Sequence, residues 1–339
     1  MNKSSFSREG QVVTPEIQAL PKAELHRHLE LCMRPSTIRE LAPQFGIELP
    51  DKESFQQRFV ILEPMQDLGA VLNKFLDTQK LLASEEILER LAFEACEDAF
   101  KNENIHLLEL RYAPTFIHQG HPHLSFAKIH SAICRGLDRA RKQYPIEVGL
   151  ICILQRILAY KDNELVTEFA IENADTFLGL DLADNEVGFD CKPFAPLFAR
   201  AKAAGLGITV HSGEADVPEA AQYVRDAIEC LGAERIGHGV QIYRDPEVMK
   251  LVKERGVTLE LCPTSNWLTN AIPNLKEHPF KILMDSGLKV TINTDDPVIF
   301  NTDLNWEYQL LQRHLGLSLK ELAECSEQAR RSSFLTREN

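Results

Sequence analysis

Ala23-Glu24-Leu25-His26-Arg27-His28-Leu29 (residues 23–29) is the first of eight short runs that decide the fold of this chain. The runs are dense in Ile, Leu and Val, as β-strands buried on both faces of a sheet should be. Turns and amphipathic helical patterns separate them. The predicted strands are 23–29, 105–113, 148–154, 176–182, 207–210, 235–240, 257–262 and 289–293. Eight strands alternating with helices predict an α/β protein, a (β/α)8 TIM-type barrel.

Helix end signals support the same alternation. Asp245 is a suitable N-cap, and Gly256 is suited to end the helix that follows it. A doubly wound open sheet is the rival, but no G-x-G-x-x-G follows the first strand, which weakens its dinucleotide-binding version. Residues 31–82 are predicted to form a helical insertion after that strand, and residues 1–16 a flexible arm. No linker divides residues 17–339, which are predicted to form a single catalytic barrel domain.

The composition argues against several classes of protein. The formal net charge is −13 and Lys and Arg form no cluster, so a nucleic-acid partner is not expected. No stretch of the 339 residues reaches the roughly 18 apolar residues of a membrane span. The first residues lack the apolar core of a secretory signal. Eight Cys without a C-x-x-C pair argue against a Cys-based zinc site and favour the reducing cytoplasm. The oligomeric state stays open.

The first strand carries a candidate half of a metal site. Residues two apart on a strand point to the same face, so His26 and His28 should both face the barrel interior. Two imidazoles side by side supply two metal ligands. By itself the H-x-H pattern is weak, because such pairs also arise by chance in packed strands.

Three further polar clusters follow predicted strands. His211 and Glu214 follow the strand at 207–210, where barrel active sites lie, although an ordinary turn with a solvated Glu has the same pattern. His238 lies between two glycines, which favours a catalytic or substrate-facing side chain over a packed one. Asp295 and Asp296 precede a Pro, and a metal would relieve the repulsion between two buried carboxylates. A plain Asp-Asp-Pro turn is the alternative.

Taken together, these clusters predict a hydrolytic metal site. Strand ends on one face of a barrel would supply three His and one Asp, a nitrogen and oxygen set that suits Zn²⁺. Zn²⁺ lowers the pKa of a bound water to about 7, and the spare Glu, His and Asp would handle protons and orientation.

Seven motifs carry a resemblance to a known family. They are Leu-Pro-Lys-Ala-Glu-Leu-His-Arg-His-Leu-Glu (20–30), Glu-Leu-Arg-Tyr-Ala-Pro (109–114), Gly-Leu-Asp-Leu-Ala (179–183), His-Ser-Gly-Glu (211–214), Arg-Ile-Gly-His-Gly (235–239), Cys-Pro-Thr-Ser-Asn (262–266) and Asn-Thr-Asp-Asp-Pro (293–297). In their order and approximate spacing, across about residues 17–335, the chain resembles the adenosine/adenine deaminase family of zinc barrels.

The resemblance implies roles for individual residues. The implied ligands of one zinc ion per chain are His26, His28, His211 and Asp295. His28 is also expected to lie against the substrate. Glu214 would deliver a proton to purine N1, and His238 would orient and polarise the attacking water. Asp296 would hydrogen-bond purine N7. The implied reaction converts adenosine, or 2′-deoxyadenosine, to inosine and ammonia.

Departures from the family pattern affect the choice of substrate. Glu30 matches an acidic position that meets the ribose 5′-hydroxyl in adenosine deaminases, but Leu31 follows it in place of the usual Gly. Asp184 replaces a Gly whose backbone N–H reaches purine N3, and its side chain adds bulk and charge. A deaminase of adenine, or of a modified nucleoside such as aminodeoxyfutalosine, therefore stays a candidate beside adenosine.

The helical insertion carries an apolar row that resembles the family's lid over the nucleoside pocket. Its members are Leu68, Val71, Leu72 and Phe75, which ordinary core packing would also explain. Two other functions remain as rivals. A zinc barrel acting on an ester or amide is disfavoured by the combination of Glu214, His238 and Asp296. A non-catalytic zinc-binding barrel is disfavoured because no implied ligand or proton-transfer residue is missing.

Overall fold

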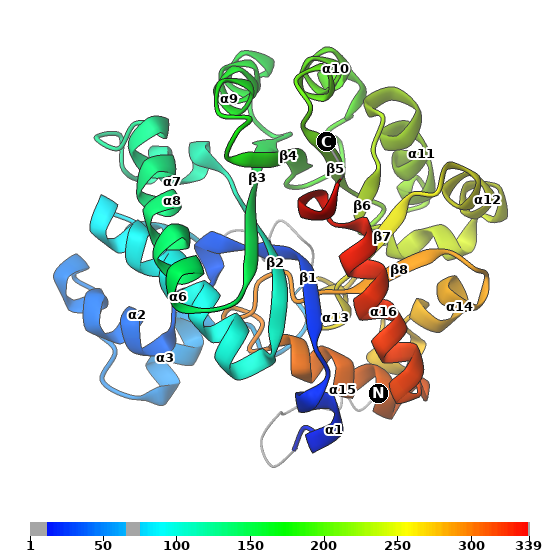
Figure 1. Cartoon of the computed structure of the whole chain (residues 1–339), viewed down its shortest axis with the longest axis horizontal. Helices are drawn as coiled ribbons and strands as arrows, with labels where there is room; N and C mark the ends of the chain where they lie inside the picture. The colour runs from blue at the N-terminus through cyan, green and yellow to red at the C-terminus, as the bar shows by residue number, and fades with distance from the viewer. Residues whose placement is uncertain (1–11, 66–74, 338–339) are drawn as a thin grey trace.

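Eight parallel strands form one barrel-like sheet in the order β1 to β8, with helices outside it (Figure 1). The structure is a computed structural model that describes residues 12–65 and 75–337. The strands are β1 Lys22–His28, β2 Ile105–Tyr112, β3 Glu147–Gln155, β4 Phe177–Ala183, β5 Gly207–Ser212, β6 Arg235–His238, β7 Thr258–Leu261 and β8 Lys289–Ile292. The predicted (β/α)8 TIM-type barrel is confirmed, and each predicted strand end lies within two residues of the observed one.

The first and last strands meet just beyond the end of β8. The His28 N–H donates to the Asp295 carbonyl at 3.0 Å, and the Asp295 N–H donates to the His26 carbonyl at 2.9 Å. These bonds tie the segment after β8 to β1, so the barrel closes beside three of the residues singled out in the sequence. Asp295 adopts φ +64°, a left-handed conformation that is uncommon for a non-glycine residue.

The helices surround the sheet and carry the expected end signals. Those that follow strands on the outside are α6 Glu85–Glu103, α8 Phe126–Gln143, α9 Tyr160–Glu172, α10 Ala195–Ala203, α11 Ala220–Leu231, α12 Pro246–Arg255, α14 Phe280–Asp285 and α16 Leu319–Ser332. Asp245 accepts from the N–H groups of Glu247 and Val248 at the start of α12, and Gly256 ends that helix at φ +65°. Within the described residues, no helix has the length and apolar character needed to cross a membrane.

Further helices lie in the connections. These are α1 Pro15–Ala19, α2 Pro35–Leu41, α3 Lys52–Phe59, α5 Leu76–Leu81, α7 Pro114–Gly120, α13 Pro263–Leu268 and α15 Leu304–Leu315. The 3₁₀ turns are η1 Leu29–Leu31, η2 Ala42–Phe45, η4 Lys192–Phe194, η5 Val240–Arg244, η6 Leu275–Glu277 and η7 Phe334–Thr336. Helices α2, α3 and α5 lie in the predicted insertion at 31–82.

Two sequence predictions fall partly outside the described residues. Of the apolar row in the insertion, Leu68, Val71 and Leu72 lie outside them, and Phe75 is described and buried. Residues 1–11 of the predicted arm also lie outside them. Helix α1 begins at Pro15, so it spans the predicted boundary between arm and barrel, and that boundary stays a prediction.

The aromatic ring of Phe334 packs against β4 and β5 at Gly179 and Gly207, where a side chain would collide with it. A Cβ atom on Gly207 would lie 2.6 Å from the ring of Phe334, and one on Gly179 would lie 2.9 Å from it. We therefore expect Gly207→Ala to lower the free energy of unfolding by about 1–3 kcal/mol, because the ring would have to move. Urea denaturation would measure this. Adding Phe334→Leu should recover part of the loss, and an unchanged midpoint for Gly207→Ala would contradict the packing argument.

Candidate metal and catalytic site

A cavity of about 400 Å³ lies over the carboxyl ends of the strands, the end of the barrel where the sequence clusters were predicted. Its volume is in the usual range for small-molecule sites. Of the described residues given a site role above, all line it except His26, which is fully buried. The polar groups on its wall include His28, Glu30, Asp184, His211, Glu214, His238, Asp295 and Asp296, and the apolar groups include Leu31, Phe75, Leu76, Phe116, Ile153 and Phe300.

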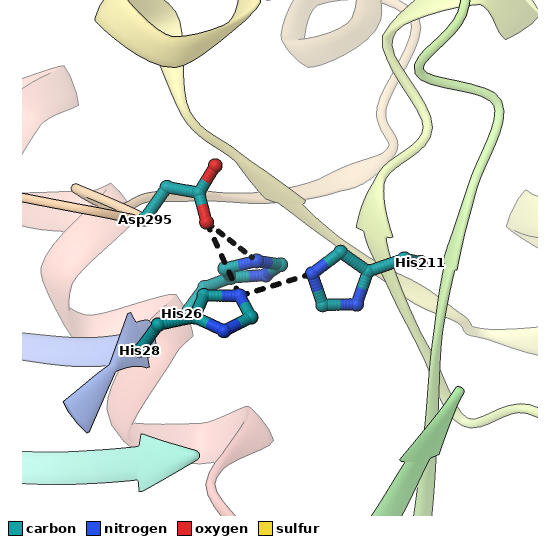
Figure 2. A group of neighbouring side chains, drawn as sticks. All are labelled: His26, His28, His211 and Asp295. Atoms are coloured by element: carbon teal, nitrogen blue, oxygen red, sulfur yellow. Dashed lines mark hydrogen bonds and ion pairs between the residues drawn. The ribbon is translucent and has the colours of Figure 1, made fainter. Parts of the chain in front are cut away.

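Three imidazoles and one carboxylate converge at the floor of the cavity (Figure 2). Asp295 Oδ1 lies 3.4 Å from His26 Nε2 and 3.3 Å from His28 Nε2. His28 Nε2 lies 3.2 Å from Nε2 of His211, which comes from the opposite side of the barrel on β5. All four potential ligand atoms lie within 4.8 Å of one another. The strand alternation thus places both β1 histidines on the inner face.

The group fits a divalent metal ion. His26 Nε2 is buried and has no hydrogen-bond partner, although it is aimed at the other three side chains. Burial lowers the pKa of His211 to about 4, so its ring is neutral at physiological pH, as a ligand requires. Three ring nitrogens and one carboxylate oxygen in a buried cluster are a donor set that Zn²⁺ favours.

Carboxylates behind the histidines fix which nitrogen faces the cavity. Glu260 Oε2 on β7 accepts from His26 Nδ1 at 2.7 Å. Asp181 on β4 accepts from His211 Nδ1 at 3.1 Å. A proton held on each Nδ1 leaves the Nε2 lone pair free for a metal. The Ser265 hydroxyl also donates to Asp295 Oδ2 at 2.7 Å, which leaves Oδ1 turned toward the histidines.

Two buried arginines balance these carboxylates. Arg111 Nη1 lies 2.8 Å from Asp181 Oδ2, and its Nη2 lies 2.7 Å from Glu260 Oε2. Arg235 Nε lies 2.6 Å from Glu260 Oε1. Burial alone would raise the pKa of Glu260, but the two guanidinium groups hold it well below its usual range. The carboxylates that orient the histidines are therefore ionised.

Glu214 lies above the metal cluster as a strongly perturbed acid. Its Oε1 accepts from the Thr269 hydroxyl at 2.9 Å, and its Oε2 lies 3.5 Å from His238 Nε2. Burial, and then the charges of Asp295 and Glu186, raise the pKa of Glu214 to about 8. At neutral pH its carboxyl group is therefore mostly protonated and able to donate.

His238 presents an N–H to the same space. Asn266 Nδ2 donates to His238 Nδ1 at 3.0 Å, so the proton of the neutral ring sits on Nε2. Nε2 points toward Glu214 and lies 3.9 Å from Asp295 Oδ2. Burial lowers the pKa of His238, which keeps the ring neutral. Its backbone adopts φ +64°, and strain of this kind is often found at functional positions.

Asp296 is not among the four residues of the metal cluster. Its Oδ1 is buried without a hydrogen-bond partner, and the residue lines the cavity. Burial, followed by the charges of Asp295 and Glu30, raises the pKa of Asp296 well above its usual range. One carboxylate of the adjacent pair therefore lies at the histidines, and the other lines the cavity.

Glu30, expected beside the ribose, and Asp184, expected beside purine N3, both lie on the cavity wall. Glu30 Oε1 accepts from the Ala113 N–H at 2.6 Å, and its Oε2 is buried without a partner. Asp184 adopts φ +81°, and its Oδ2 accepts from Gln155 Nε2 at 3.1 Å. The Asp184 side chain is thus held by Gln155, where a glycine would leave open space.

Sequence reasoning gave no role to the groups behind the site. Glu260 lies in a predicted apolar strand, and a buried acid there was a signal that its partners lie inside the barrel. Asp181 and Arg111 belong to quoted motifs without an assigned function. Asn266 also belongs to a quoted motif without an assigned function, and Thr269 offered no signal beyond its place after a strand.

Comparisons with a family model, with known sequences and with solved structures all give deaminases. The family model described as adenosine deaminase matches residues 21–339. An adenosine deaminase of Escherichia coli O1:K1 is 35% identical over 321 residues, which cover 94% of this chain and 95% of that relative. The barrel also superposes on adenine deaminase from Arthrobacter aurescens with a TM-score of 0.85, at 27% identity, covering 93% of this chain and 94% of that one.

Two further solved structures are similar. An amidohydrolase from Burkholderia ambifaria with bound Zn has a TM-score of 0.84 and 25% identity, covering 97% and 90% of the two chains. The N6-methyl-AMP deaminase from Arabidopsis thaliana has a TM-score of 0.80 and 30% identity, covering 94% and 93%. With a family match over most of its length and a relative at this identity, the chain belongs to the adenosine deaminase family, hydrolases that act on C–N bonds of amidines.

Proposed function

We propose that this protein is a zinc-dependent deaminase that converts adenosine and 2′-deoxyadenosine to inosine or 2′-deoxyinosine and ammonia. One observation carries the proposal: a three-histidine, one-aspartate cluster shares a cavity with a raised-pKa glutamic acid and a free aspartic carboxyl. The proposed ligands of one zinc ion are His26, His28, His211 and Asp295. When bound, zinc supplies a nucleophilic hydroxide near neutral pH without a strong base.

The protein's own groups perform the remaining steps. Protonated Glu214 donates to purine N1, which draws electrons from C6 and prepares it for addition of water. The Nε2–H of His238 orients and polarises the attacking oxygen. Asp296 is protonated because its pKa is raised, so it donates a hydrogen bond to the N7 lone pair. The hydroxyl proton on the tetrahedral C6 then passes to the amino group, the C6–N bond breaks to release ammonia, and a 6-oxopurine remains.

The cavity wall favours a substrate without phosphate. Among the described residues, five acids line the cavity and neither Lys nor Arg does; the acids are Glu30, Asp184, Glu214, Asp295 and Asp296. A phosphate there would find no cation to neutralise it among the described lining residues. The unpartnered Oε2 of Glu30 is instead suited to a hydroxyl group such as the ribose 5′-OH. These features support a nucleoside over a nucleotide.

Adenine itself is the second candidate substrate. The side chains of Leu31 and Asp184 line the cavity at positions where the family pattern has Gly, so both take up space that a Gly would leave. A smaller ligand without a sugar would tolerate this loss of space. A modified nucleoside such as aminodeoxyfutalosine remains a third option that uses the same chemistry.

An ultraviolet assay of the zinc-loaded protein tests the proposal. Adenosine, 2′-deoxyadenosine, adenine, aminodeoxyfutalosine and AMP are compared at equal concentration. Turnover of adenosine to inosine with little turnover of AMP is expected. Turnover of adenine alone would leave the proposed mechanism standing and would indicate that Leu31 and Asp184 exclude the sugar. If zinc is bound and none of the five reacts, the proposed function is wrong.

Metal removal should have two separable effects. Dialysis against a chelator is expected to abolish turnover, and one equivalent of Zn²⁺ should restore it. The melting temperature should also fall, because a ligand that binds only the folded state stabilises it by mass action. Scanning calorimetry of native, stripped and reconstituted protein would measure the shift. Activity that survives complete removal of metal, confirmed by elemental analysis, would rule out the proposed site.

A further inference from the structure

One buried acid outside the cavity holds the segment that carries Glu214. Glu186 follows β4 and is 3% exposed. Its Oε2 accepts from the Gly213 N–H at 2.8 Å, and its Oε1 accepts from the N–H groups of Glu214 and Ala215, both at 2.8 Å. Three consecutive backbone donors thus converge on one carboxylate, in an arrangement that suits an anion.

Arg156 and Gln241 donate hydrogen bonds to backbone carbonyl groups of the segment 211–214. Arg156 Nη2 donates to the His211 carbonyl and, at 3.3 Å, to the Leu182 carbonyl. Gln241 donates from its backbone N–H to the Gly213 carbonyl at 3.0 Å, and from Nε2 to the Glu214 carbonyl at 3.2 Å. The backbone of Glu214 is therefore fixed at both its N–H and its carbonyl.

We propose that Glu186 is a positioning residue for the acid Glu214. Glu186 is not among the residues that line the cavity, so it acts through the backbone of 213–215. Proton delivery requires the Glu214 carboxyl to lie within hydrogen-bond reach of the accepting nitrogen, and small displacements reduce the rate strongly. The inference rests on the proposed role of Glu214 and extends it to a residue that no sequence cluster singled out.

The charge of Glu186 has a second effect. The titratable groups that act on Glu214 are Asp295 and Asp296 after β8, Glu186 after β4, His238 at the end of β6 and His26 on β1. Burial, Asp295 and Glu186 raise the pKa of Glu214, and the Thr269 hydrogen bond and His26 oppose the shift. Burial also raises the pKa of Glu186 itself, but Arg156 and the three N–H donors favour its ionised form.

Two variants separate the geometry from the charge. Glu186→Gln keeps the length and removes the charge, and Glu186→Asp keeps the charge and withdraws the carboxylate by one methylene. Both should lower kcat about 10- to 100-fold per bound zinc, with KM changed by less than about threefold. Only Glu186→Gln should also move the alkaline limb of the kcat–pH profile to lower pH, because a like charge near Glu214 is lost.

The matched control is Glu172→Gln on the exposed face of α9. The expected kcat loss in both variants, with the limb shifted only in Glu186→Gln, supports the inference. Unchanged kcat, or a loss that simply follows the fraction unfolded or lacking zinc, overturns it. If Glu186→Gln does not fold, the split between kcat and KM in Glu186→Asp decides. An inactive Glu214→Gln beside active Glu186 variants rejects this inference and leaves the proposed function intact.

Discussion

Glu214→Gln should lower kcat for adenosine about 10²- to 10⁴-fold, the usual contribution of a positioned general acid. Gln keeps the size of the side chain and can still hydrogen-bond Thr269, but it cannot give a proton to purine N1. KM and zinc content should change little, because the loss lies in the chemical step. Steady-state kinetics with elemental analysis of the same sample would measure both. The exposed Glu172→Gln is the matched control.

The pH profile gives an independent test of the same role. Burial, Asp295 and Glu186 raise the pKa of Glu214 to about 8, so its protonated form is present below that pH and is lost above it. The kcat of the native protein should therefore fall as pH rises through about 8, and the residual rate of Glu214→Gln should lack this limb. A variant that retains the native rate, or the native alkaline limb, would exclude Glu214 as the proton donor.

The fold was accessible from the sequence because each strand has a local signature. Parallel barrel strands are buried on both faces, so they read as short runs of Ile, Leu and Val between turns. The predicted ends of the strands were less accurate where the backbone turns sharply. β6 ends at His238, since His238 and Gly239 adopt φ +64° and +67°, and apolar content alone extended that run to Val240. β5 continues to Ser212, since His211 and Ser212 pair with β6.

Part of the site was accessible for a similar reason. Alternation along one strand places His26 and His28 on the same face, and strand ends of a barrel meet at one rim. The position of Asp295 relative to His26 was not readable, because it depends on two backbone bonds that join β1 to the segment after β8. Long-range bonds of this kind leave no local pattern in the sequence.

The supporting groups show where sequence reasoning ends. Glu260, Arg111 and Asp181 come from β7, β2 and β4, and each is 0% exposed. A buried charge on an apolar strand signals that a partner exists, but it does not say which strand supplies it. Only the closed barrel brings these charges together beneath the histidines, so the residues that orient the metal site emerge from the fold.

Removing one of those charges should have the largest effect on stability. Glu260 accepts hydrogen bonds from His26, Arg111 and Thr209 and forms an ion pair with Arg235, and all of these groups are buried. Glu260→Gln would leave two buried guanidinium groups without their full countercharge. Breaking a buried ion pair in this way typically costs about 3–5 kcal/mol. Urea denaturation of the metal-free proteins at pH 7 would measure the difference, with Glu172→Gln again as the control.

The pH dependence of that difference identifies its cause. The folded-state pKa of Glu260 lies well below the unfolded value of about 4.5, so its stabilisation is present above pH 4.5 and is lost as pH falls toward the folded-state pKa. The gap between the native protein and Glu260→Gln should therefore narrow below about pH 4.5. A gap that stays constant with pH would point to lost packing instead of lost charge. With His26 released from its carboxylate, Zn²⁺ affinity should also fall about 10- to 100-fold, because the ring is no longer held with Nε2 toward the cluster.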